Sequence, residues 1–151
     1  MMKNIIVLIL FLITSCGYQP LYKVEKRLNY EFINEVEFLG NKKISKQIFS
    51  KLPYKINSSD KKLNKIIFDS KINTIETSKD SKGKVTSYRT SLTVNYSLLD
   101  QKNNTLDNKL FSKEFSYNSD ENKFKFKDYQ KKVEKNLIDG IIKNIIIHLN
   151  L

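Results

Sequence analysis

The chain has one cysteine and one histidine among its 151 residues, and these two side chains are the best suited to metal, redox or nucleophilic chemistry. One cysteine and one histidine are too few for a zinc cluster, an iron–sulfur site or an internal disulfide, and we expect no Cys–His nucleophile pair. The carboxylates Glu35, Glu37 and Asp69 stand at strand spacing without a second group to complete an acid–base pair. We therefore expect no enzyme, no metal and no cofactor, and we interpret His148 as a packing or capping residue.

The residues that precede Cys16 suggest another role for its thiol. A lysine-bearing start is followed by an apolar run from Ile5 to Ile13, which is too short to cross a bilayer as a helix. Residues 1–15 therefore indicate a secretory signal peptide. Their ending, ITSC, resembles a bacterial lipobox, in which the cysteine is lipidated on sulfur and becomes the new N-terminus. The alternative is an ordinary signal peptide with an incidental cysteine.

The residue after the cysteine is Gly17 and not aspartate. By resemblance to the sorting of Gram-negative lipoproteins, this points to the outer membrane. Several acyl chains on Cys16 would hold the protein there essentially permanently. We interpret residues 16–27 as a lipidated tether and residues 28–151 as a single domain.

The chain is basic, with 27 Lys and Arg against 16 Asp and Glu and a formal net charge of +11. Only Arg27 and Arg89 are arginine, and the chain is rich in Lys, Asn and Ile, so part of this charge is compositional. A basic surface favours anionic partners such as nucleic acid, acidic lipid or phosphorylated glycolipid. A secreted protein does not meet nucleic acid in the cytoplasm, so we expect the partner to be a lipid or glycolipid.

Hydrophobic periodicity predicts six elements. Apolar residues alternate with polar ones in four segments and recur at helical spacing in two, the second of which opens at Asp128 as a plausible N-cap. The predicted strands are 28–39, 63–77, 88–98 and 109–117, and the predicted helices are 44–52 and 128–149. The order β-α-β-β-β-α predicts an α+β fold, a four-stranded, mostly antiparallel sheet with two helices packed on one face.

Two features of this sheet are candidate binding surfaces. Polar residues of the third strand share one face, which is either an interface or an ordinary solvated side; they include Arg89, Ser91, Thr93 and Asn95. Two lysine groups are expected in loops at the same end of the sheet, namely Lys79, Lys82 and Lys84, and Lys123, Lys125 and Lys127. Ammonium groups beside Phe124 and Phe126 suit phosphates beside acyl chains. The alternative is that a lysine-rich chain carries lysine in every loop.

The heptad CGYQPLY, from Cys16 to Tyr22, resembles the mature N-terminus of the lipopolysaccharide-assembly lipoprotein family LptE, especially its alphaproteobacterial branch. The stretch SYRTSLTVNYSLLD, from Ser87 to Asp100, is similar to that family's third strand. An aromatic-ended fourth strand and a lysine-rich terminal helix complete the same element order. The resemblance covers nearly the whole mature chain.

This resemblance implies a lipid-anchored, periplasm-facing protein that is not an enzyme. It would sit in the lumen of an LptD-like outer-membrane barrel, assist the assembly of that barrel and help to deliver lipopolysaccharide to the outer leaflet. Lys82 and Lys127 best match the family's lipopolysaccharide-contacting basic positions. The alternatives are a structural lipoprotein or assembly chaperone of another outer-membrane complex, and, less favoured, a secreted hydrolase.

Overall fold

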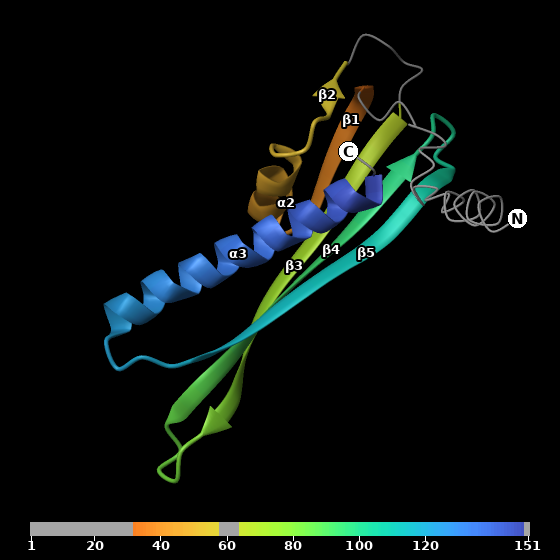
Figure 1. Ribbon diagram of the computed structural model, residues 1–151. Coiled ribbons are helices and arrows are strands. Elements are labelled where there is room, and N and C mark those ends of the chain that lie inside the picture. The colour runs from red at the N-terminus through yellow and green to blue at the C-terminus, as the bar shows by residue number, and fades with distance from the viewer. Residues whose placement is uncertain (1–31, 58–63, 150–151) are drawn as a thin grey trace, which may run out of the picture.

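The computed structural model describes residues 32–57 and 64–149, in which two helices cover one face of a five-stranded sheet (Figure 1). The strands are β1 (Phe32–Gly40), β2 (Lys55–Ile56), β3 (Asn64–Lys79), β4 (Val85–Leu99) and β5 (Thr105–Asn118), and the helices are α2 (Lys42–Phe49) and α3 (Lys123–Leu149). The predicted signal peptide (1–15), the tether with Cys16 (16–27) and the first residues of the predicted first strand (28–31) lie outside the described residues.

The sheet has the strand order β2-β1-β3-β4-β5 and differs from the predicted one in two respects. It contains a fifth strand, the two-residue β2, at the edge beside β1. In addition, β1 runs parallel to both of its neighbours, while only the β3–β4 and β4–β5 pairs are antiparallel. The parallel pairing has a physical reason, because α2 carries the chain back along the sheet before β3 begins, and parallel neighbours need such a crossover.

The helix-facing side of the sheet forms the core. On β4 every second residue is buried, as its sequence pattern predicts: Thr90, Leu92, Val94, Tyr96 and Leu98. Helix α2 packs Ile44 and Ile48 onto β1 and β3, and α3 packs its isoleucine-rich face onto β4 and β5. Lys51, in the turn after α2, forms a 2.6 Å ion pair with Asp139 of α3. The prediction that two helices pack on one face of the sheet is therefore confirmed.

A buried polar corner links β1, α2 and β3. The Ser45 and Ser70 hydroxyls lie 2.7 Å apart, and the Ser70 hydroxyl donates to the Asn41 carbonyl at 2.9 Å. Gly40 turns the chain into α2 with a φ of +59°, where a Cβ would overlap the Ser70 carbonyl oxygen. Only glycine fits such a close approach to a neighbouring backbone.

Helix α3 begins at Lys123, so the prediction of an N-cap at Asp128 is wrong. Asn122 acts earlier, because its side-chain oxygen accepts hydrogen bonds from the Phe124 and Lys125 backbone N–H groups, each at 3.1 Å. The second lysine group therefore lies on the first turns of a helix and not in a loop. Within the described residues, no helix has the length and apolarity needed to cross a bilayer.

Candidate functional site

The two lysine groups lie toward the same end of the sheet, as predicted. The turn between β3 and β4 contacts the segment before α3, where the Lys84 ammonium lies 3.1 Å from the Glu121 carboxylate. The Ser119 backbone N–H also donates to the Thr86 carbonyl at 2.8 Å. Figure 1 shows the β3–β4 hairpin projecting beyond the first turn of α3. This end of the molecule thus brings together two lysine-bearing segments that are far apart in the sequence.

The six predicted lysines differ in how they are engaged. Lys79 pairs with Glu76 at 3.2 Å and Lys84 pairs with Glu121, so these two ammonium groups already have carboxylate partners. The other four are exposed and take part in no ion pair within residues 32–57 and 64–149: Lys82, Lys123, Lys125 and Lys127. They are the ones that an anionic ligand could engage without first breaking an ion pair.

Lys127 lines a groove of about 320 Å³ between α3 and the helix-facing side of β3 and β4. The groove carries a chain of hydroxyl groups, in which Thr74 and Thr90 lie 2.8 Å apart and Thr90 and Tyr117 lie 3.0 Å apart. Lys131 lies on the same side of α3, one helical turn after Lys127. Ammonium and hydroxyl donors beside an apolar wall can bind an anionic group attached to a hydrocarbon.

Sequence reasoning missed Lys131 and the hydroxyl chain. The i, i+4 spacing of Lys127 and Lys131 could have revealed the pair, had the helix been expected to begin before Lys127. The Thr90–Tyr117 contact depends on the antiparallel register of β4 and β5, in which Tyr117 lies diagonally from Thr90. No local sequence signal specifies that register.

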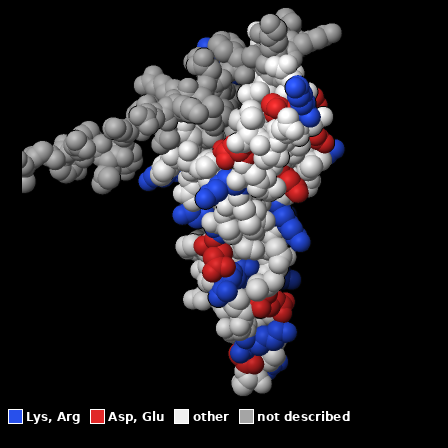
Figure 2. Space-filling model, turned by 90° about the vertical axis from the view of Figure 1, so that its right-hand side faces the viewer, with Lys and Arg blue, Asp and Glu red and all other residues white. Residues whose placement is uncertain are grey.

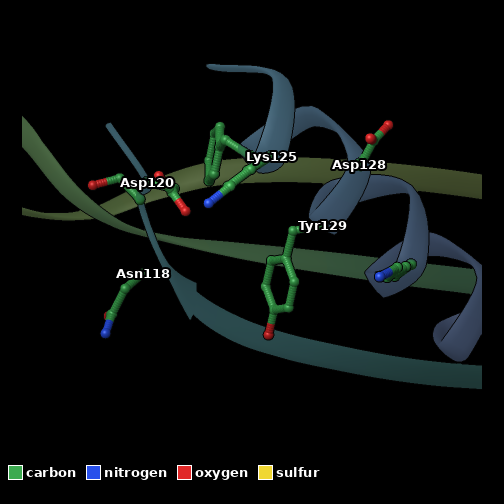
Figure 3. A pocket seen from close by; sticks show the side chains of 8 residues that line it. Asn118, Asp120, Lys125, Asp128 and Tyr129 are labelled. Carbon is green, nitrogen blue, oxygen red and sulfur yellow. The ribbon is translucent and has the colours of Figure 1, made fainter. Parts of the chain in front are cut away.

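A second hollow, of about 550 Å³, lies beside the neighbouring face of α3, between the first turns of the helix and the end of β5 (Figure 3). Its lining combines polar and aromatic side chains, among them Asn118, Asp120, Lys125, Phe126, Tyr129 and Lys132. Lys125 belongs to the predicted lysine group but faces this hollow, whereas Lys127 faces the groove. Helical periodicity separates the two lysines because residues two apart point in different directions.

Several aromatic rings pack together where the first turns of α3 meet the ends of β4 and β5. Tyr117 contacts Tyr129, Phe126 and Tyr88 with ring centroids 5.7 to 6.0 Å apart. Phe126 is partly buried against the core, whereas Phe124 is 85% exposed. The two phenylalanines of this lysine segment therefore differ: Phe126 packs α3 onto the sheet, and Phe124 is exposed to solvent.

The predicted interface residues share the sheet face opposite the helices. Arg89, Ser91, Thr93 and Asn95 alternate with the buried residues of β4, and no described element covers them. The Arg89 Nε donates to the Ser116 hydroxyl on β5 at 3.2 Å. By strand register, exposed Ile75 and Leu110 lie on the same face, so this uncovered surface mixes polar and apolar side chains.

The carboxylates Glu35 and Glu37 lie at the surface, as predicted, and both pair with Lys65 on β3, at 3.1 and 2.9 Å. Hydrogen bonds from Lys65 to Glu37 and Glu35 raise the pKa of this lysine above its usual range.

Figure 2 shows basic and acidic side chains alternating along the length of the molecule on the face it presents. The net positive charge is therefore spread over this view and does not form one patch.

His148 has a packing role, as the sequence predicts. Its Nε2 lies 2.8 Å from an Asp107 carboxylate oxygen, and its ring meets the edges of Tyr96 and Phe111. The contact holds the end of α3 onto β5. Among the residues that the structure describes, no three His, Cys, Asp or Glu side chains are grouped closely enough to hold a metal ion.

The architecture is that of a small α+β domain with both helices on one sheet face and the other face open. Solved lipoproteins share this fold. Rare lipoprotein B from Shewanella oneidensis superposes with a TM-score of 0.60 at 11% sequence identity, over 78% of this chain and 94% of that one. A minor lipoprotein from Acinetobacter baumannii gives 0.59 at 15% identity, over 80% and 90% of the two chains.

Lipoprotein B from Nitrosomonas europaea also matches, with a TM-score of 0.53 at 14% identity, over 81% of this chain and 86% of that one. No family model matches the sequence, and no curated protein matches it. The chain therefore has the fold of these bacterial lipoproteins and spans most of their length.

Proposed function

We propose that this chain is an LptE-type lipoprotein that is anchored in the outer membrane, binds an LptD-like barrel and helps to deliver lipopolysaccharide. The likeness in fold to solved lipoproteins is the observation that carries the proposal. The lipobox-like ITSC and the heptad that follows it support the same reading from a part of the chain that lies outside the described residues.

The open face of β4 is the surface that we assign to the barrel. Its hydroxyl and amide side chains can donate and accept hydrogen bonds, which suits the polar interior of a barrel. Arg89 and Thr93 stand near the middle of this face, away from both helices. The exposed Ile75 and Leu110 would add apolar contacts to the same interface.

The lysine-bearing end of the sheet is the part that we assign to lipopolysaccharide. Lys82 on the hairpin and Lys127 beside the groove supply free ammonium groups for the phosphates of lipid A. The hydroxyl chain from Thr74 to Tyr117 uses two of its three protons internally and offers the third as a further hydrogen-bond donor to the same oxygens. The apolar wall at Ile72 lies in the same groove and could contact an acyl chain.

Isolation of the full-length lipidated chain from outer membranes tests the proposal directly. We expect an LptD-like barrel to co-purify, and mass spectrometry of the N-terminus to find acyl groups on Cys16. A Cys16→Ser variant should remain uncleaved or mislocalised. Co-purification of a different complex would favour a structural lipoprotein or another assembly chaperone, and an unmodified thiol would refute the lipid anchor.

A further inference from the structure

We propose that the hollow between the first turns of α3 and the end of β5 binds a sugar ring. The proposal rests on the proposed function for the source of that sugar, which would be the saccharide part of the same glycolipid. The volume of about 550 Å³ lies within the range of small-molecule sites. Asn118, Tyr129 and Lys132 line it from different elements or turns, so the site is built by the fold and not by one loop.

Tyr129 provides the stacking surface. Its ring is held by Tyr117, with centroids 5.7 Å apart, yet the residue remains 43% exposed. Figure 3 shows the side chain pointing from α3 toward β5 across the hollow. The π face of an aromatic ring is negative and attracts the weakly positive C–H groups of a pyranose. A ring that is fixed on one side and open to a hollow is suited to such stacking.

The polar lining has both kinds of hydrogen-bonding group that sugar hydroxyls require. Asp120 and Asp128 can only accept, Lys125 and Lys132 can only donate, and the Asn118 amide can do both. The Asn122 backbone N–H donates to one carboxylate oxygen of Asp120 at 2.8 Å, and the second oxygen is left for a ligand. A hydroxyl group both donates and accepts, so sugar hydroxyls can pair with either kind of side chain, although Asp128 already accepts from Lys131 at 3.5 Å.

Charge distinguishes this hollow from the groove at Lys127. Two carboxylates and two ammonium groups line the hollow, so its formal charge is zero, whereas Lys127, Lys131 and Glu134 give the groove a formal charge of +1. Lys131 pairs with Asp128 of the hollow at 3.5 Å, so Lys127 is the ammonium group of the groove that has no ion pair within the described residues. A balanced lining gives no net attraction to phosphate and favours a neutral, hydroxyl-rich ligand. The two faces of α3 would thus bind different parts of one glycolipid, the phosphates on one side and the sugar on the other.

Saturation-transfer NMR on the full-length chain in detergent tests this site, with lipid-free core oligosaccharide as the probe. We expect transfer to the sugar ring protons and at least a fivefold loss of this signal in Tyr129→Ala. Phe124→Ala is the matched control, because Phe124 is an exposed aromatic residue of the same helix that does not line the hollow. Circular dichroism checks that each variant is folded.

A second pair of variants keeps the test decisive if Tyr129→Ala does not fold. Lys132→Glu removes a donor from the hollow and should weaken the signal severalfold, whereas Lys135→Glu makes the same charge change outside it and should not. Equal signals for each variant and its control would overturn the sugar site. So would the absence of transfer to the sugar from wild-type protein that binds intact lipopolysaccharide, and the proposed function would then still stand. Failure to bind intact lipopolysaccharide would instead refute the proposed function.

Discussion

The Lys84 ammonium lies 3.1 Å from the Glu121 carboxylate, and this contact joins the β3–β4 hairpin to the segment that precedes α3. Both side chains are largely exposed, so the pair adds little to stability. Its importance is positional, because it lies at the end of the molecule to which the strand order brings both the hairpin lysine Lys82 and the helix lysine Lys127.

Replacement of Lys82 and Lys127 together by aspartate should weaken binding of purified lipopolysaccharide by about tenfold. Each exposed ammonium–phosphate contact is worth only about 0 to 1 kcal/mol, so the single changes should be mild, whereas the double change adds repulsion to the lost attraction. Binding is measured by titration of the full-length chain. The wild-type affinity should fall as added salt shortens the screening length below about 10 Å.

The matched control for this pair is Lys102→Asp with Lys109→Asp, an equal charge change toward the opposite end of the sheet. It should leave the affinity nearly unchanged. If both double variants lose affinity equally, net charge alone drives binding and the localised site is wrong.

Much of this fold could be predicted because local patterns agree with the tertiary structure. The alternation on β4 identified its buried face, and the turn residues between β3 and β4 and between β4 and β5 marked both hairpins. The placement of both lysine groups at one end followed from the up-down-up order of these strands.

The parts that could not be predicted depend on contacts between distant segments. The strand β2 has two residues, too few for any periodicity, and exists only because β1 offers an edge for pairing. Ile33 is buried because β1 has a register irregularity between Ile33 and Glu35, which simple alternation does not anticipate. At the start of α3, Asn122 and Asp128 are both residue types that can cap a helix. Lysine and phenylalanine alternate between them, and this period of two does not indicate the helix that begins at Lys123.

Gly40→Ala should destabilise the domain by more than about 2 kcal/mol, because a Cβ would meet the Ser70 carbonyl oxygen and a φ of +59° strains any L-residue. Gly83→Ala is the control. Gly83 also has a positive φ, of 79°, but no atom lies within 4 Å of the added Cβ, so the loss should be only about 1 kcal/mol. Urea unfolding measures both, and equal losses would contradict the proposed close approach at Gly40.

Gly140→Ala should stabilise the protein by up to about 1 kcal/mol. Gly140 lies inside α3, where glycine is less favourable than alanine, and an added Cβ would meet the Lys113 side chain at an ordinary contact distance of 3.6 Å. Thermal unfolding should show a higher midpoint. A lower midpoint would mean that α3 needs a closer approach to β5 at this position than the structure indicates.

Asp100 should contribute a pH-dependent part of the stability in acid. Hydrogen bonds from the Asn104 side chain, and then from the Asn104 and Lys102 backbone N–H groups, lower the pKa of this carboxyl. A lowered pKa in the folded state stabilises the fold above the unfolded-state pKa of about 4, and this contribution is lost as the pH falls through the folded-state value. Asp100→Ala should therefore be less stable than wild type at pH 7, with a difference that shrinks below about pH 4. A difference that does not change with pH would argue against an ionised carboxylate in this turn.

The placement of the open β4 face against an LptD-like barrel is the central claim, and a photo-cross-linker at Thr93 of the full-length chain in intact cells tests it most directly. The side chain at this position points away from both helices, and exposed substitutions usually change stability by less than about 0.5 kcal/mol. We predict a cross-link to the barrel, and its loss when Arg89→Glu is added to disrupt the face. A folded, lipidated protein that gives no barrel cross-link from Thr93 or from Arg89 would contradict the assignment.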